Sequence, residues 1–254
     1  MQILPLIILV VGGFIGGFFG SAVGSAGLVS LPILLLLGFS PHAAIGTTRP
    51  AAVILEAISA VRYRREKVLT TPLLRRGLFL GIAGALGSTT GAIIVSGVSD
   101  QTLRLLLASI IACMAIFLCM KKEWGMTERP KLQSHHLLIV GSTFLTGLYA
   151  GFFGFTFGTL MTIVVVGFGY TLLQGAALSR VIGALASAAS ASVFAMQGYV
   201  DVPHSIALAI GFGIGGWMGA KYASKAGNRY VKILLMVVVA CSVIKLLFDY
   251  VHAA

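Results

Sequence analysis

Long apolar runs without charge dominate the pattern of hydrophobic and polar positions along this chain. No Asp, Glu, Lys or Arg occurs in residues 1–48, 77–99, 132–179, 181–200 or 202–220. A membrane-spanning helix needs about 20 predominantly apolar residues, so each of these runs has the length of a span or more. The pattern therefore predicts an all-α polytopic membrane protein.

Polar breaks divide these runs into helical elements. We expect helices at 3–20, 28–38, 42–61, 76–97 and 102–120, and then at 136–155, 159–169, 172–196, 204–222 and 229–249. The second and seventh elements have about 11 residues, or about 16 Å of helix, which crosses only half of a hydrocarbon core of about 30 Å. We therefore expect two broken or re-entrant hairpins with glycine-rich turns at 21–27 and 155–158, and about eight to ten membrane segments.

The two halves of the chain repeat the same motifs in the same order. Gly-Phe-Phe-Gly at 17–20 returns at 151–154, a hydroxyl residue followed by arginine at 48–49 returns at 179–180, and Pro72 matches Pro203. Paired halves are typical of transporters. The repeat predicts two homologous transmembrane halves, 1–125 and 132–254, which together form one membrane domain.

The placement of basic residues predicts the topology. Most of the 18 Lys and Arg residues lie in segments 62–76, 121–131 and 221–232, which the positive-inside rule places in the cytoplasm. The loop at 197–204, which contains Asp201, is then outside. The two halves are therefore predicted to be inverted repeats, with both termini outside. Because the basic residues sit in short loops, the net charge of +11 indicates contact with membrane lipid rather than with nucleic acid.

Composition argues against an enzyme. Only 10% of the residues are charged, against about a quarter in soluble domains. The three cysteines lie in apolar runs without a CxxC motif, and the five histidines lie near predicted span ends. We therefore expect no catalytic residues, no metal site and no cofactor.

Three ionisable residues fall inside predicted spans: Arg49, Glu56 and Arg180. Charges at such depth are costly and by default mark a functional site. The two arginines follow Thr48 and Ser179 at equivalent places of the repeat, so we interpret them as anion ligands; snorkelling or structural pairing is the alternative.

Glu56 lies two turns from Arg49 on the same helix face, and its counterpart in the second half is Ser187. Two interpretations stay open. Glu56 is either a structural counter-ion for Arg49 or a proton-coupling group, since desolvation favours the neutral acid and a nearby cation favours the carboxylate.

The glycine-rich breaks supply the other candidate ligands. A helix start presents unpaired N–H groups and the positive end of the dipole, which suits an anion. Close helix packing is the alternative role for these glycines. The candidate substrate-binding residues are Ser21, Gly24, Ser25, Ala26, Gly27, Thr47, Thr48, Arg49, Thr156, Gly158, Thr159, Ser179 and Arg180.

These motifs resemble the first-repeat signature of the TauE/SafE permeases. The resemblance rests on Gly-Ser-Ala-Val-Gly-Ser-Ala-Gly at 20–27, Pro-His-Ala-Ala-Ile-Gly-Thr-Thr at 41–48 and Arg-Tyr-Arg-Arg at 62–65, and it extends through both halves. It implies a bacterial or archaeal inner-membrane exporter of sulfite and organosulfonates, with the family's Gly-rich turn at 24–27 and its Gly-Thr-Thr segment at 46–48. The chain departs from the family pattern at Ser21, Ser25 and Ala26, which leaves the particular anion open.

Together these features predict a secondary transporter, in the export direction, for small sulfur-containing anions such as sulfite, thiosulfate or sulfoacetate. An anion channel and a carrier of another small carboxylate or oxyanion remain alternatives. A non-transporting scaffold would need neither paired arginines nor broken helices, and a cation permease would need more intramembrane carboxylates than Glu56.

Overall fold

A computed structural model describes residues 3–95, 136–154 and 156–253, with the helix course alone given beyond residue 234. These residues form helices and no strand. The helices are α1 (Ile3–Val23), α2 (Gly27–Leu36), α3 (Pro41–Arg65), α4 (Thr71–Val95), α6 (His136–Phe152), α7 (Phe157–Gly167), α8 (Leu172–Met196) and α9 (Val202–Ala253). The all-α prediction is confirmed for this part of the chain.

Local sequence signals explain where the longer helices begin. The Ser40 hydroxyl caps α3 by accepting a hydrogen bond from the backbone N–H of Ala43, and Pro41 occupies the first turn, where the missing N–H costs nothing. Thr171 and Gln174 form a reciprocal capping box at the start of α8. The predicted boundaries of both helices hold to within a few residues.

Two elements differ from the prediction. Helix α4 begins at Thr71, five residues earlier than expected, because Arg75 and Arg76 lie within the helix and do not interrupt it. The elements expected at 204–222 and 229–249 are joined in α9, whose backbone breaks at Gly227 (φ 74°). The element expected at 102–120 and the basic segment 121–131 lie outside the described residues.

Four of the described helices are long and apolar enough to span a membrane: α1, α3, α4 and α8. Three further helices, α2, α6 and α7, are apolar but shorter. Many large apolar side chains point away from the bundle, such as Leu78, Phe79 and Ile82 of α4. An outward apolar surface of this kind fits a lipid environment.

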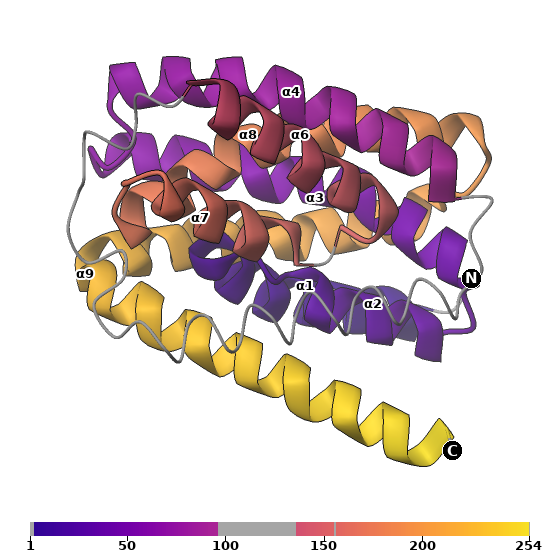
Figure 1. The fold of residues 1–254 in the computed structure, drawn as a ribbon. Coiled ribbons are helices and arrows are strands. Elements are labelled where there is room, and N and C mark those ends of the chain that lie inside the picture. Colours follow the sequence, from indigo (N-terminus) through magenta and orange to yellow (C-terminus); the bar gives the residue numbers. More distant parts are fainter. Residues whose placement is uncertain (1–2, 96–135, 155, 254) are drawn as a thin grey trace.

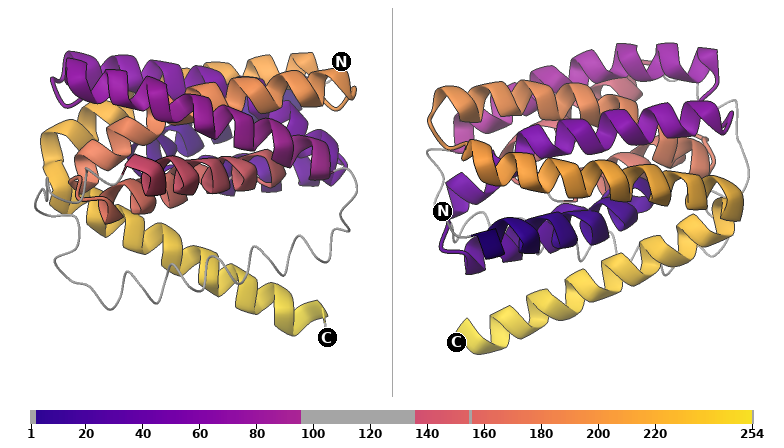
Figure 2. Two further views of the ribbon diagram at one scale, coloured as in Figure 1. Left: turned by 45° about the horizontal axis from the view of Figure 1, so that its top comes forward. Right: turned by 180° about the vertical axis from the view of Figure 1, so that it is seen from behind.

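The helices run roughly along one direction and pack across the predicted halves (Figures 1 and 2). Helix α1 packs along α9, and α6 packs along α4, while α3 and α8 contact each other at the centre. In the numbering of the predicted repeat, the first helix of each half lies on the fourth helix of the other.

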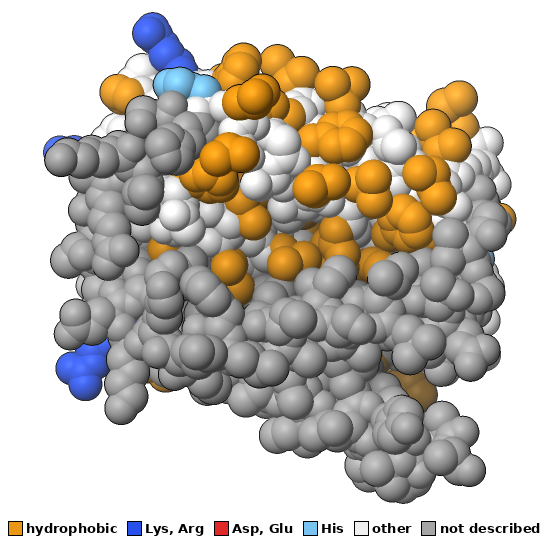
Figure 3. All heavy atoms as spheres, in the orientation of Figure 1, with side chains coloured by type: hydrophobic (Ala, Val, Ile, Leu, Met, Phe, Trp, Pro, Cys, Tyr) orange, Lys and Arg blue, Asp and Glu red, His pale blue; other side chains and the backbone are white. Residues whose placement is uncertain are grey.

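The two ends of the bundle differ in charge. Helix α1 begins and α9 ends at one end of the bundle, whereas the α3–α4 connection and the break of α9 lie at the opposite end (Figures 1 and 2). On the face drawn in Figure 3, the visible Lys and Arg side chains lie at that opposite end, and apolar side chains spread over the upper part from the middle to the right. In the described part of the chain, the start of α1 and the end of α9 therefore lie opposite the basic segments 62–76 and 221–232. Which end faces the cytoplasm stays a prediction.

Candidate functional site

The breaks between α1 and α2 and between α6 and α7 meet inside the bundle. Gly24 (φ 85°) ends the first helix of one pair, and Gly154 (φ 63°) ends the first helix of the other; glycine adopts such backbone angles without a steric penalty. The backbone of Gly24 lies directly against Gly158, so a methyl group at position 24 would overlap it. The Thr159 hydroxyl donates to the carbonyl of Val23 at 2.5 Å and ties the two breaks together.

Arg180 of α8 reaches into this junction and is 1% exposed. Its Nη1 donates to the carbonyl of Gly20 at 2.8 Å and to Oε1 of Glu56 at 3.1 Å, and it lies 3.0 Å from Oε2 of the same carboxylate. Its Nη2 donates to the Ser179 hydroxyl at 3.1 Å. The guanidinium therefore joins the C-terminal end of α1 to α3 through charge-assisted hydrogen bonds.

Arg49 of α3 occupies the equivalent place in the other half but has different partners. It is 3% exposed, and its Nη2 donates to the carbonyl of Ala150, near the end of α6, at 2.6 Å. Its Nε has no hydrogen-bond partner, and no carboxylate of the described residues lies within ion-pair distance of it. The charge of Arg49 is therefore buried without a counter-ion in the described part of the chain.

The proposed pairing of Glu56 with Arg49 is wrong, because the carboxylate pairs with Arg180. Two helical turns separate Glu56 from Arg49, a rise of about 10 Å, which two side chains on one helix do not close directly. Arg180 comes from the facing helix α8 and meets the carboxylate in the space between the helices.

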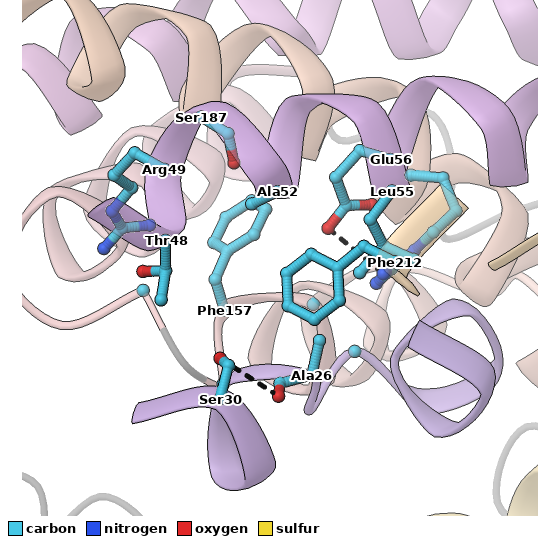
Figure 4. A pocket seen from close by; sticks show the side chains of 15 residues that line it. Ala26, Ser30, Thr48, Arg49, Ala52, Leu55, Glu56, Phe157, Ser187 and Phe212 are labelled. Carbon is cyan, nitrogen blue, oxygen red and sulfur yellow. Dashed lines mark hydrogen bonds and ion pairs between the residues drawn. The ribbon is translucent and has the colours of Figure 1, made fainter. Parts of the chain in front are cut away.

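A small cavity lies between the two breaks and the central helices α3 and α8. Its volume is about 30 Å³, which is room for very few water molecules. Figure 4 shows Arg49 and Glu56 on opposite sides of Phe157 in this space. The lining residues are Gly24, Ala26, Gly27, Ser30, Thr48, Arg49, Ala52, Leu55, Glu56, Gly154, Phe157, Gly158, Arg180, Ser187 and Phe212.

The structure brings eight of the candidate residues to this cavity and places the others around it. Those that line it are Gly24, Ala26, Gly27, Thr48, Arg49, Glu56, Gly158 and Arg180. Ser179 and Thr159 do not line the cavity. Ser179 accepts a hydrogen bond from Arg180, and Thr159 donates one to the carbonyl of Val23. Ser21 and Ser25 are buried beside the first break.

Two threonines among the candidates are occupied elsewhere. Thr47 accepts a hydrogen bond from the backbone N–H of Asp201 at 3.0 Å and so holds the loop before α9. The hydroxyl of Thr156 lies 2.5 Å from that of Tyr149. Neither side chain lines the cavity.

The remaining lining residues were not among the candidates. Ser30 lies one turn after the first break, and Gly154 and Phe157 flank the second, so their position in the repeat was a usable signal. Phe212 comes from α9, and no feature of its local sequence places it at the cavity. In the described part of the chain no group of three His, Cys, Asp or Glu side chains could hold a metal ion.

Asp201 lies outside the helices considered as spans and opens α9. Its carboxylate accepts hydrogen bonds from the backbone N–H of His204 at 3.1 Å and lies 2.6 Å from the Nδ1 of the same residue. Partial burial raises the pKa of Asp201, but the bonds to His204 outweigh it, so this pKa is lower than usual.

Comparisons with known proteins identify the relatives of this chain. The family model described as "Sulfite exporter TauE/SafE" matches residues 9–246. A "Probable membrane transporter protein" of Haemophilus influenzae is 25% identical, covering 93% of this chain and 92% of its own length. The "Probable membrane transporter protein YfcA" of Escherichia coli K12 is 24% identical, with 89% and 83% covered.

A third relative, the "Probable membrane transporter protein ORF9" of a Sinorhizobium species, is 25% identical over 96% of this chain and 93% of its own. No solved structure matches the chain. The resemblance seen in the sequence is confirmed, because the family model extends over nearly the whole chain. The chain belongs to the sulfite exporter TauE/SafE family of membrane transporters.

Proposed function

We propose that this protein is a secondary transporter that exports a small sulfur-containing oxyanion across the cell membrane of a bacterium or archaeon. Sulfite, thiosulfate and sulfoacetate are the proposed substrates, in keeping with the description of the family. The single observation that carries the proposal is the pair of buried guanidiniums, Arg49 and Arg180, on one cavity between two broken helices.

A buried arginine is costly unless an anion or several acceptors compensate its charge. Arg180 has Glu56, but Arg49 has one carbonyl oxygen and an unpaired Nε in the described part of the chain. An oxyanion offers the planar guanidinium several acceptor atoms at once. Arg49 is therefore the proposed principal ligand.

The starts of α2 and α7 strengthen the case for an anion. Ala26 and Gly27 at one start and Phe157 and Gly158 at the other line the cavity. Neither helix has a side-chain hydrogen bond capping its N-terminus. Two positive dipole ends directed toward one space favour negative charge there.

A carrier is favoured over a channel by the size of the cavity. In the described part of the chain, the space beside the arginines has a volume of only about 30 Å³, which is much smaller than the continuous path that a pore needs. We propose that the two halves, 1–125 and 132–254, are inverted repeats and that their relative movement opens the cavity to each side in turn. The exchanged packing of α1 on α9 and of α6 on α4 supports this arrangement.

Glu56 is the proposed proton-coupling group. It lies on the cavity wall beside Arg180, and its counterpart Ser187 cannot titrate. The ionised Glu56 carboxylate and a bound anion are both stabilised by the positive charge of the arginines, so each weakens the other. Proton release from Glu56 and anion binding are therefore linked.

The test is transport of radiolabelled sulfite and thiosulfate by purified protein in liposomes. We expect saturable uptake that depends on the proton gradient, and we expect Arg49→Ala and Arg180→Ala to weaken anion binding about ten- to a hundred-fold, because each loses a charge-assisted partner worth about 1.5–3 kcal/mol. Arg75→Ala is the control, since this exposed arginine of α4 lies away from the cavity. Non-saturating flux with large single-channel currents would indicate a channel. Wild-type affinity in both arginine variants would show that the anion does not bind in this cavity.

A further inference from the structure

The ionisable side chains on the cavity wall carry a net positive charge. Two guanidiniums, Arg49 and Arg180, and one carboxylate, Glu56, face the space, so the formal charge is +1 while Glu56 is ionised. The ion pair between Glu56 and Arg180 neutralises one cation. The uncompensated charge is the one on Arg49.

The elements around Glu56 supply no further charge to this balance. Helices α1, α2 and α7 contain no ionisable residue, and Arg180 is the charged residue of α8. On α3 itself, Tyr63 follows Glu56 by two turns and donates its hydroxyl hydrogen to the carbonyl of Ser21. From α9, Phe212 reaches the cavity. Among the described residues, Arg180 is therefore the charged group in direct contact with the Glu56 carboxylate, and Arg49 is the other charge on the cavity wall.

We infer that this cavity takes a monovalent oxyanion on Arg49 while Glu56 neutralises Arg180, and that it takes a divalent oxyanion only together with a proton on Glu56. The inference rests on the proposed function and adds a rule of valence to it. A monoanion brings the cavity to neutrality. A dianion leaves one uncompensated negative charge in a space with almost no water, which is strongly unfavourable.

Protonation of Glu56 removes that penalty. A proton from the solvent forms an O–H bond on the carboxylate, the ion pair with Arg180 is lost, and the cavity charge becomes +2. Both arginines are then available to a divalent oxyanion. By linkage, binding of the dianion takes up one proton, and acid strengthens that binding, whereas binding of a monoanion takes up none.

The residue at position 187, in the second half of the chain, also supports a site for one anionic charge on Arg49. Ser187 of α8 occupies the place that corresponds to Glu56 and lies on the cavity wall. A carboxylate there would face Arg49 as Glu56 faces Arg180, and it would complete a second ion pair. The serine leaves the Arg49 charge to the anion.

The experiment compares two tetrahedral probes whose charges stay fixed between about pH 6 and about pH 8: methanesulfonate, a monoanion, and sulfate, a dianion. Calorimetry on the purified wild-type protein, in buffers with different ionisation enthalpies, measures affinity and the number of protons taken up. We expect sulfate to bind at least about ten-fold more weakly than methanesulfonate at the higher pH. Sulfate binding should strengthen at the lower pH with uptake of about one proton, and methanesulfonate binding should take up none.

Two substitutions test the residues. Glu56→Gln should strengthen sulfate binding at least about ten-fold at the higher pH and flatten its pH response. Ser187→Glu should abolish methanesulfonate binding at the higher pH, while the uncharged, similarly sized Ser187→Gln keeps it.

Equal affinity for both probes at the higher pH, or sulfate binding without proton uptake, would overturn the rule of valence, and neither measurement requires a variant. An unchanged preference in Glu56→Gln would overturn the role of that carboxylate. If the wild-type protein binds neither probe nor sulfite, the proposed function itself fails. A protein that binds both probes equally keeps the proposed function and loses only this inference.

Discussion

At the scale of single residues, Arg49 and Arg180 hold equivalent places in the predicted repeat and differ in their surroundings. Arg180 bonds to Glu56, Gly20 and Ser179, so it is part of the network that holds the bundle together. Arg49 donates one hydrogen bond among the described residues, to the carbonyl of Ala150. Arg180 should therefore matter more for stability, and Arg49 should matter more for binding of the ligand.

Thermal unfolding of the detergent-purified protein tests this difference. Arg180→Ala leaves Glu56 buried without its cation, and breaking a buried pair in this way costs about 3–5 kcal/mol. Arg49→Ala leaves no carboxylate without its cation, so it should lower the unfolding temperature much less. Combining Arg180→Ala with Glu56→Gln should restore part of the lost stability, since no buried charge is then left alone. Equal destabilisation by the two single substitutions would contradict the assignment.

At the scale of elements, the turn between α1 and α2 is in close contact with the turn between α6 and α7. Gly24 and Gly158 touch through their backbones, and Gly24 has a positive φ of 85°. The packing leaves no room for a side chain at this point. Gly38, after α2, has a similar φ of 88° but no atom near the position of an added methyl group.

This pair of glycines separates steric contact from backbone strain. Gly38→Ala carries the strain alone and should lose about 1–2 kcal/mol of stability. Gly24→Ala carries the same strain and also overpacks the junction, which adds about 1–3 kcal/mol and moves the start of α2 away from the cavity. We therefore expect Gly24→Ala to lose anion transport in liposomes and Gly38→Ala to keep it. Similar transport by the two variants would show that the junction tolerates separation.

At the scale of the whole molecule, the bundle has a basic end and an opposite end where α1 begins and α9 ends (Figures 1 and 3). The basic end contains the C-terminal turn of α3, with Arg62, Arg64 and Arg65. Arg62 and Arg65 lie against the ring of Trp217 at 4.7 and 5.0 Å. Arginine and tryptophan at the same level are typical of a membrane interface, and the charge favours the cytoplasmic side.

Labelling of single cysteines in intact cells tests this orientation, in a background whose native Cys113, Cys119 and Cys241 are replaced. Asp201→Cys should react with a membrane-impermeant maleimide from outside, and Lys225→Cys should react only after the membrane is permeabilised. The two positions mark the loop before α9 and the basic stretch before its break. Labelling of position 201 from the cytoplasmic side alone would make the inverted topology wrong.

The sequence by itself determined the class of protein and most helix boundaries. Apolar runs without charge specify membrane helices because the cost of burying charge in lipid acts on each segment separately. Caps such as Ser40 and Thr171 act within one helical turn, so they too can be recognised from the local sequence. The equivalent hydroxyl–arginine pairs of the two halves identified Arg49 and Arg180 as the central residues of the candidate site, and the motifs around them identified the family.

Only the tertiary structure decided which groups meet. The partner of Glu56 is Arg180 rather than Arg49, the backbones of Gly24 and Gly158 touch, and Phe212 of α9 lines the cavity. Each of these facts depends on how far apart two helices lie and how each is rotated about its axis. Those quantities arise from side-chain packing between segments distant in the sequence, and periodicity within one segment does not contain them. The charge balance of the cavity, and with it the proposed valence of the substrate, is for that reason a property of the fold.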